Sequence, residues 1–188
     1  MTATTTFKRV LIGQPAGGEF AEKNHDESEI TLTPNIDAAA VHDNPNDFNE
    51  MALNPDTSSA VLDSLVDADH WMVNFWVAAN PAISPETQLR LADYPESGVR
   101  SHLISNPSVT PETLHALASS GYRDLRAQVA ASDKVAIADL SVLAADDDQY
   151  VLAQVTVNPL TPRNIIERLA KHPKYVFIRE QAAKRLAA

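Results

Sequence analysis

The chain has 188 residues, a formal net charge of −10 at pH 7 and no cysteine. This length allows one domain with a tail, and the lack of cysteine excludes disulfides and thiolate metal sites, as in a cytoplasmic protein. No apolar run approaches the roughly 20 residues of a membrane span, and the apolar stretch 10–12 is too short for the ~7–15-residue core of a signal peptide. We therefore expect a cytoplasmic protein without a membrane partner.

The first 53 residues differ in composition from the rest of the chain. A Thr-rich start is followed by a turn at Pro15 and Gly17-Gly18, a single apolar anchor at Phe20, and an acidic stretch that ends at Leu32. The segment 9–32 resembles a short N-terminal segment of actinobacterial proteins, often from phages and other mobile elements, which brings no defined activity. We predict a flexible, partly disordered tail over residues 1–33.

From residue 54 onward the sequence repeats. Asn-Pro pairs and one Ser-Asp pair keep a constant spacing of 26 residues, at Asn54, Asn80, Asn106, Ser132 and Asn158. A fixed period of a few tens of residues is the signature of a solenoid. We predict five units, over residues 54–79, 80–105, 106–131, 132–157 and 158–188.

Each unit contains two segments with an apolar face of helical period. The first segment carries two apolar columns, which are Leu62, Leu114, Leu140 and Ile166 (interrupted by Gln88), and Leu65, Leu91, Leu117, Leu143 and Leu169. Helix starts are predicted at Ser84-Pro85, Thr110-Pro111 and Thr161-Pro162. The second segment carries Val73/Val77, Val99/Leu103, Leu125/Val129 and Val151/Val155. It ends at the next Asn-Pro, where we expect Asn in the left-handed conformation and Pro to stop the helix.

Helical pairs that cannot bury their apolar faces alone form one core by stacking. We therefore predict an all-α fold, a right-handed alpha-solenoid of about five 26-residue helical-pair repeats, in which the first element is either an α-helix or a 3₁₀ turn. Residues 34–53 are predicted to be a degenerate capping half-repeat, because the segment 47–53 precedes Asn54 as a second helix precedes each later Asn-Pro. Asp37, Asp43, Asp47 and Glu50 would give this cap a polar outer face.

The pattern NPxxTPETLxxLA…VRxxVA, as in residues 106–131, resembles the leucine-rich-repeat-variant proteins of bacteria, alpha-solenoids related to armadillo and HEAT repeats. The resemblance covers residues 54–188 and implies a surface that binds other macromolecules rather than an enzyme. The iron–sulfur site known in that family needs a cysteine cluster. Because this chain has no cysteine, that cofactor is not carried over, and we expect no cofactor.

Charge is distributed unevenly along the chain. The net charge is −6 over residues 1–53, −9 over residues 54–162 and +5 over residues 163–188. The acidic body argues against nucleic-acid binding, since phosphate contacts supply most of that affinity. The basic end is interpreted as a solvated terminal cap with cations near a helix C-terminus, and contact with an acidic partner is the alternative. Its members are Arg163, Arg168, Lys171, Lys174, Arg179, Lys184 and Arg185.

No catalytic or metal-binding motif organises the ionisable residues. The six histidines form no i, i+4 pair, and Asp146-Asp147-Asp148 lacks the glycine and the terminal glutamate of an EF-hand loop. We predict that this Asp run is the joint between two helices and helps to cap the second one. There is no nucleophile elbow, and no Lys-Ser/Thr follows Gly17-Gly18 as a P-loop requires. No catalytic, cofactor-binding or metal-binding residue is therefore predicted.

Candidate partner-binding residues lie in the second segments. Trp71, Phe75 and Trp76 occupy positions that later units fill mainly with polar residues, so either the N-terminal segment covers these rings or they form an exposed hot spot. At the unit position of Trp76, later units carry His102, Gln128 and Gln154, beside a uniformly apolar column. A variable column of this kind is either solvated surface or a ladder of partner contacts.

These observations predict a non-enzymatic protein-binding scaffold, encoded by an actinobacterial phage or mobile element. Its partner would contact Trp71, Phe75, Trp76, His102, Gln128 and Gln154. The alternative is an acidic DNA mimic that inhibits a DNA-binding enzyme. A HEAT-like DNA-processing enzyme would need a basic groove, which the acidic middle units do not provide.

Overall fold

The computed structural model describes residues 36–188, so the whole of the predicted tail, residues 1–33, lies outside the described range. Within that range all regular structure is helical, as predicted, and no strand is found. The elements are α1 (Ala38–Asp43), η1 (Pro45–Phe48), α2 (Asn49–Leu53), α3 (Ser59–Asp67), α4 (Trp71–Ala79), α5 (Pro85–Ala92), α6 (Ser97–Ser105), α7 (Pro111–Ala118), α8 (Arg123–Ala131), α9 (Ile137–Leu143), α10 (Gln149–Val157), α11 (Arg163–Leu169) and α12 (Val176–Ala187).

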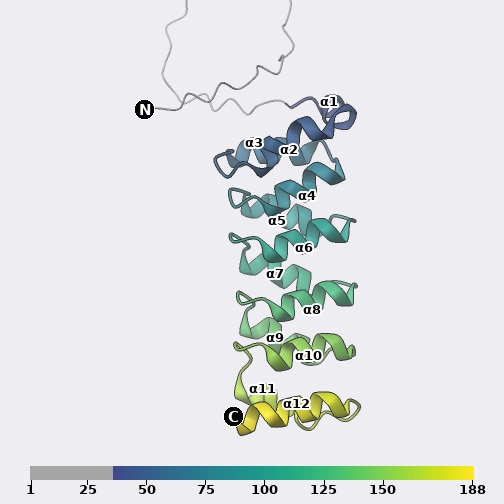
Figure 1. Cartoon of the computed structure of the whole chain (residues 1–188), viewed down its shortest axis with the longest axis vertical. Coiled ribbons are helices and arrows are strands. Elements are labelled where there is room, and N and C mark those ends of the chain that lie inside the picture. Colours follow the sequence, from purple (N-terminus) through teal and green to yellow (C-terminus); the bar gives the residue numbers. More distant parts are fainter. Residues whose placement is uncertain (1–35) are drawn as a thin grey trace, which may run out of the picture. The chain divides into compact units, whose positions relative to one another are not determined.

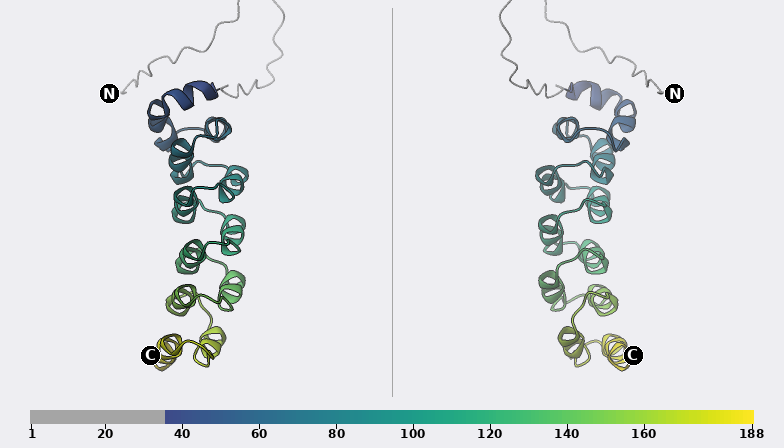
Figure 2. Two further views of the ribbon diagram at one scale, coloured as in Figure 1. Left: turned by 90° about the vertical axis from the view of Figure 1, so that its right-hand side faces the viewer. Right: turned by 90° about the vertical axis from the view of Figure 1, so that its left-hand side faces the viewer.

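From α3 onward the helices alternate between two rows (Figures 1 and 2). In the even-numbered row, α4, α6, α8, α10 and α12 each contact the next member. In the odd-numbered row, α5 contacts α7 and α7 contacts α9. A short joint links each odd-numbered helix to the even-numbered helix that follows it. Residues at the same position of successive even-numbered helices therefore lie along one side of the row.

The helix boundaries follow the sequence period. The odd-numbered helices from α3 to α11 begin at residues 59, 85, 111, 137 and 163, a spacing of 26, and all of them are α-helices rather than 3₁₀ turns. The even-numbered helices from α4 to α12 begin at residues 71, 97, 123, 149 and 176. The last helix thus starts one residue later than the period predicts, because the joint before α12 is one residue longer.

The predicted apolar columns form the core. Every leucine or isoleucine in the two columns of the odd-numbered helices is at most 1% exposed, and the valine and leucine pairs of α4 to α10 are equally buried. In α12 the pair is Ile178 and Ala182, both 0% exposed, which matches the one-residue shift. Ala78 and Ala130 are also fully buried at the ends of their helices. The removal of these side chains from water is the main force that holds the rows together.

Two of the three predicted helix starts are confirmed. The hydroxyl oxygens of Ser84 and Thr110 accept hydrogen bonds from the backbone N–H groups of Thr87 and Thr113, at 3.1 and 3.2 Å, and a proline follows each cap.

The third prediction, a cap by Thr161, is wrong. Pro162 occupies the N-cap position of α11 and makes no side-chain cap, while the Thr161 hydroxyl donates to the Val155 carbonyl at 2.6 Å. Thr161 lies one residue too early to cap the helix, at the position that Ile83 and Val109 fill in earlier units. Thr57 does the same in the first unit, where its hydroxyl donates to the Met51 carbonyl at 2.7 Å.

The expectation that Asn ends each second helix in a left-handed conformation is also wrong. Asn80 has φ −74° and ψ 127°, and Asn106 has φ −64° and ψ 131°, which is extended backbone. A proline follows each of these residues, and a residue before proline is driven towards extended backbone. Among the described residues only Asp69, at φ 52°, is a non-glycine residue with positive φ.

The asparagine of each Asn-Pro pair acts through its side-chain amide, which bonds to the backbone of the preceding unit. The Asn106 amide nitrogen donates to the carbonyls of Ala78 and Asn80, at 2.7 and 2.9 Å, and its oxygen accepts from the Ser108 N–H at 2.7 Å. Asn80 makes the corresponding bonds to Ala52 and Asn54, and Asn158 makes those to Ala130 and Ser132. Each asparagine thereby supplies hydrogen-bond donors to carbonyls at the end of the previous even-numbered helix, where intrahelical donors run out. The repeat period is thus enforced by hydrogen bonds between successive units as well as by packing.

Where the asparagine is missing, a lysine or arginine side chain donates hydrogen bonds to backbone carbonyls in its place. The unit that begins at Ser132 uses the Lys134 ammonium, which donates to the carbonyls of Asn106 and Pro107 at 3.0 and 2.6 Å. After α12, the Arg185 guanidinium donates to the carbonyls of Thr156 and Asn158 at 2.7 and 2.6 Å. With the one-residue shift, Arg185 stands where the next asparagine would be. The carbonyls at the end of α10 are therefore satisfied without a further unit.

Gln88 interrupts an apolar column, and the sequence predicts that Leu in its place is neutral or stabilising if the column is buried. The column is buried, but Gln88 is fully bonded within it. Its amide nitrogen donates to the Ser108 carbonyl at 3.0 Å, and its oxygen accepts from the Thr110 N–H at 2.9 Å and from the Thr113 hydroxyl at 3.2 Å. Gln88 therefore links two units, and leucine would remove the partner that Gln88 gives to the Ser108 carbonyl and the Thr110 N–H.

Residues 36–53 continue the even-numbered row at its N-terminal end. Helix α2 contacts α4, and Val41, Phe48 and Ala52 join the core. The Ala52 carbonyl accepts from Asn80 as the Ala78 carbonyl accepts from Asn106. Helix α1 begins with an Asp37 cap, whose carboxylate accepts from the Ala39 N–H at 3.0 Å.

Candidate functional site

The four predicted ladder residues lie on successive even-numbered helices. Trp76 is in α4, His102 in α6, Gln128 in α8 and Gln154 in α10, and each is partly exposed. Next to them, Val77, Leu103, Val129 and Val155 are 0% exposed. Because each of these helices contacts the next, the ladder residues form a row along one side of the protein. The row combines a buried apolar base with partly exposed side chains of different chemistry.

Three rings meet at one end of this row. The Phe75 ring centroid lies 4.0 Å from that of His102 and 4.9 Å from that of Trp76, and Trp76 meets His102 edge-on at 6.4 Å. Burial in this cluster lowers the pKa of His102, so its imidazole is neutral at neutral pH. A Cβ at Gly98 would lie 3.2 Å from the Phe75 ring, so the glycine gives this ring its room.

The position of Phe75 is exposed to different degrees in different units. Phe75 in α4, Ser101 in α6 and Ala153 in α10 are partly exposed, whereas Ala127 in α8 is only 1% exposed. Phe75 is thus partly exposed together with Trp76 and His102, and the three rings form one cluster.

Trp71 is the most exposed of the predicted aromatic residues, at 51%. Its ring stacks against His70 with centroids 6.4 Å apart, and His70 in turn meets His42 of α1 edge-on at 5.4 Å. Residues 36–53 thus approach this end of α4 but leave half of Trp71 uncovered. The remainder of the proposed cover, residues 20–35, lies outside the described range.

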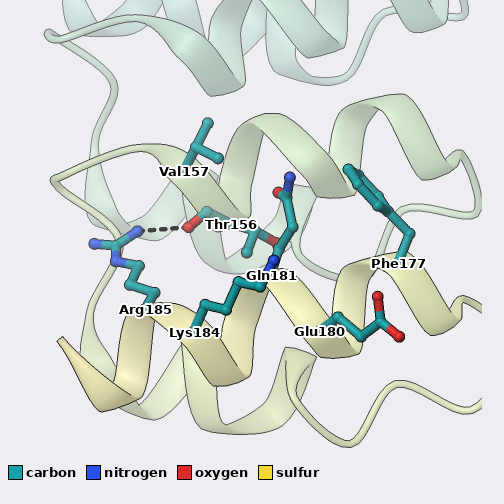
Figure 3. Close-up of a pocket in the computed structure, with 7 residues that line it drawn as sticks. All are labelled: Thr156, Val157, Phe177, Glu180, Gln181, Lys184 and Arg185. Carbon is teal, nitrogen blue, oxygen red and sulfur yellow. Dashed lines mark hydrogen bonds between the residues drawn. The ribbon is translucent and has the colours of Figure 1, made fainter.

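The row continues into α12 with a residue that the sequence comparison missed. The one-residue shift puts Gln181, not Glu180, after Gln154 in the row. Figure 3 shows Gln181 directed from α12 towards α10, between Thr156 and Phe177. These residues border a hollow of about 350 Å³ together with Val157, Lys184 and Arg185. Val157 and Phe177 are 58% and 47% exposed, so apolar groups are also available at this end of the row.

The Asp146–Asp148 run is structural. Asp148 caps α10 by accepting from the Tyr150 N–H at 2.8 Å, as predicted. Asp146 binds Arg126 through two hydrogen bonds of 2.6 and 3.1 Å and also accepts from the Asp148 N–H. Burial raises the pKa of Asp146, but the hydrogen bonds from Arg126 and from the backbone outweigh it and hold that pKa below its usual range.

Part of the basic end also makes contacts with other residues of the chain. Arg179 donates to the His172 carbonyl at 2.8 Å, Arg185 closes the carbonyls after α10, and Arg163 pairs with Glu167 at 3.0 Å. Over residues 36–188, no cluster of three or more His, Cys, Asp or Glu side chains could hold a metal ion. No helix in that range is long and apolar enough to cross a membrane.

The fold and the site define an all-helical protein of paired helices with a mixed aromatic and amide row along its even-numbered helices. Comparisons of the chain with protein-family models, with curated proteins and with solved structures found no match.

Proposed function

We propose that the protein is a non-enzymatic alpha-solenoid of five helical-pair repeats that binds a protein partner along its even-numbered helices. Support for the solenoid comes from the 26-residue spacing of the helix starts and from the two rows of helices. The asparagine bonds between successive units support the same interpretation.

The proposal for the binding face rests on one observation. Trp76, His102, Gln128 and Gln154 stand partly exposed on consecutive helices above a row that is fully buried. Core columns are uniform because packing requires it, and a column that varies is free to serve recognition. Exposed apolar side chains are available at both ends of this row, at Trp71 and at Val157 and Phe177, and Tyr122 and Tyr150 are exposed between them. Trp is enriched in binding hot spots, and amides between such anchors provide hydrogen bonds that fix the partner.

The test is affinity capture from a lysate of the native host, read by mass spectrometry, with the full chain as bait. We expect Trp71→Ala and the pair Trp76→Ala with His102→Ala to lose a partner that the unchanged chain retains. The matched control is the pair Leu89→Ala with Ile137→Ala, which removes similar apolar area from exposed positions on α5 and α9. This control should retain the partner.

Equal capture by the ladder variants, with their helical circular dichroism unchanged, would contradict the proposed face. Capture lost with the α5 and α9 control but kept with the ladder variants would move the binding face to the odd-numbered helices. Trp71→Ala guards against a folding artefact, because a side chain that is half exposed contributes little to the core.

A further inference from the structure

An arginine recurs at one position of the even-numbered helices. Its guanidinium donates to a backbone carbonyl in the joint that precedes its helix. Arg100 in α6 donates to the Tyr94 carbonyl at 2.6 Å, and Arg126 in α8 donates to the Ser120 carbonyl at 2.9 Å. In α12 the shifted equivalent, Arg179, donates to the His172 carbonyl at 2.8 Å. Arg100 and Arg126 also reach the next joint, where Arg100 stands 4.6 Å from the Tyr122 ring and Arg126 binds the Asp146 carboxylate. A guanidinium thus bridges two successive joints.

Helix α4 has Asn74 at this position. Asn74 is 0% exposed, and both polar atoms of its amide lack a hydrogen-bond partner. It lies near the Tyr94 phenol but without a hydrogen bond of normal geometry. A buried amide without partners is costly. In α10 the same position holds Leu152, also 0% exposed, which fills the space with an apolar side chain.

A cavity of about 220 Å³ lies beside the shorter side chain of Asn74. Its lining comes from the C-terminal ends of α3 and α5, from the joints that follow them and from α4, and consists of Val66, Asp67, Asp69, Asn74, Arg90, Leu91 and Tyr94. A single water needs about 10–15 Å³, so the cavity accommodates a much larger group. It lies on a different side of α4 from Trp76, because residues two apart on a helix do not face each other.

The lining suits a planar cation. Asp67 is paired with Arg90 at 2.7 Å, which leaves the exposed Asp69 carboxylate as the negative charge of the lining. Tyr94 stands where Asp146 stands for Arg126, and its ring offers the kind of face that Tyr122 offers to Arg100. Burial raises the pKa of Tyr94 to about 12, with a further contribution from Asp69, so the phenol is uncharged at neutral pH. The Asn74 oxygen adds a buried acceptor.

We propose that this cavity binds a guanidinium group from outside the protein, at the position that arginine occupies in α6 and α8. The group belongs either to a small free guanidine or to an arginine side chain of a protein. This site is independent of the even-numbered ladder and does not rest on its function. The bound guanidinium would donate to Asn74 and Asp69 and lie against Tyr94, as the internal arginines do in later units.

The experiment titrates the full chain with Nα-acetyl-arginine amide and follows the Asn74 side-chain amide and the Tyr94 ring by NMR. We expect saturable shifts at both groups, and none with Nα-acetyl-citrulline amide, which has the same shape without the charge. The absence of saturable shifts up to about 10 mM, ten times a Kd of about 1 mM, would overturn the proposal. Equal shifts with the citrulline compound would overturn it as well, because the site would then not recognise the cation.

Two kinds of variant keep the test sharp. Asn74→Arg supplies the guanidinium from within the chain, and Asn74→Leu copies Leu152, so each should abolish the shifts at Tyr94. Asp69→Asn, at an exposed position, should weaken binding at least several-fold without a change of fold. Unchanged affinity in Asp69→Asn and in a folded Asn74 variant would contradict the site.

An arginine-containing peptide separates the two sources of the guanidinium. Binding at least tenfold tighter than that of the small compound assigns the cavity to a protein's arginine, and equal binding assigns it to a small guanidine.

Discussion

Helices α4 and α8 occupy corresponding places in the even-numbered row and bury the same columns. Val73 and Val77 in α4 correspond to Leu125 and Val129 in α8, and all four are at most 1% exposed. The other positions differ in kind. Helix α8 has Arg123, Arg126 and Gln128, whereas α4 has Trp71, Asn74 and Trp76.

The shared residues are those that helix packing requires, and the residues that differ are those that packing leaves free to vary. Arg126 is satisfied within the chain by Asp146 and by the Ser120 carbonyl. Asn74 is satisfied by nothing among the described residues, and Trp71 is half exposed. In a regular unit such as 106–131 the polar side chain at this position is satisfied by the chain itself, whereas the unit 54–79 leaves Asn74 without a partner at the same position. We therefore expect recognition sites in the irregular unit rather than in the regular ones.

The largest expected effect tests the part that the two units share. Leu117→Ala and Leu65→Ala truncate side chains at the same unit position, which are 1% and 0% exposed. Each should lower the free energy of unfolding by about 2–5 kcal/mol, as buried leucine truncations do. Urea unfolding followed by circular dichroism measures both. A loss at Leu65 much smaller than at Leu117 would show that the N-terminal unit is loosely packed and would break the comparison.

An intermediate effect is expected at Gln88, in the unit between the two. Gln88→Leu removes three hydrogen bonds to the following unit and should lower the free energy of unfolding by about 1–3 kcal/mol. The control is Leu89→Gln at the exposed neighbouring position, which should change stability by about 0.5 kcal/mol or less. Unchanged or higher stability in Gln88→Leu would mean that the apolar column matters more than these bonds.

The smallest expected effect concerns the ion pair that α8 has and α4 lacks. The pKa of Asp146 is lower in the folded chain than in the unfolded chain, so its contribution is present above pH ~4 and is lost as the pH falls through the folded value. The variant also loses charge-assisted hydrogen bonds from Arg126, so we expect Asp146→Asn to be less stable than the unchanged chain at pH 7, by about 0.5–1.5 kcal/mol, the net contribution of a typical hydrogen bond. Chemical unfolding at pH 7 and pH 3 should show this gap closing in acid. A gap of the same size at both values would mean that packing, not ionisation, is lost in the variant.

The sequence predicted the elements well because the information is local and repeated. Hydrophobic period, hydroxyl caps and proline positions defined α5 and α7 closely, and the constant spacing carried the same boundaries to the other odd-numbered helices. The failures concern contacts across units. The asparagine bonds join residues 26 and 28 positions apart, and the role of Gln88 depends on groups 20 to 25 positions away. Helical periodicity within one segment contains no signal for such bonds.

The candidate site was predicted in part. The ladder positions could be found because a fixed period aligns them, but Gln181 was missed since one added residue in a joint is invisible to a strict 26-residue count. The sequence does show that Asn74 stands in a column that holds Arg100 and Arg126, and this irregularity could have pointed to the cavity. Its meaning needed the structure, which shows that those arginines bridge two joints.

The Arg185 guanidinium joins several parts of the last unit at once. It donates to the carbonyls of Thr156, Asn158 and Thr161, and so ties α12 both to the end of α10 and to the segment before α11. Fraying of the last helix is therefore opposed by a single side chain as well as by packing.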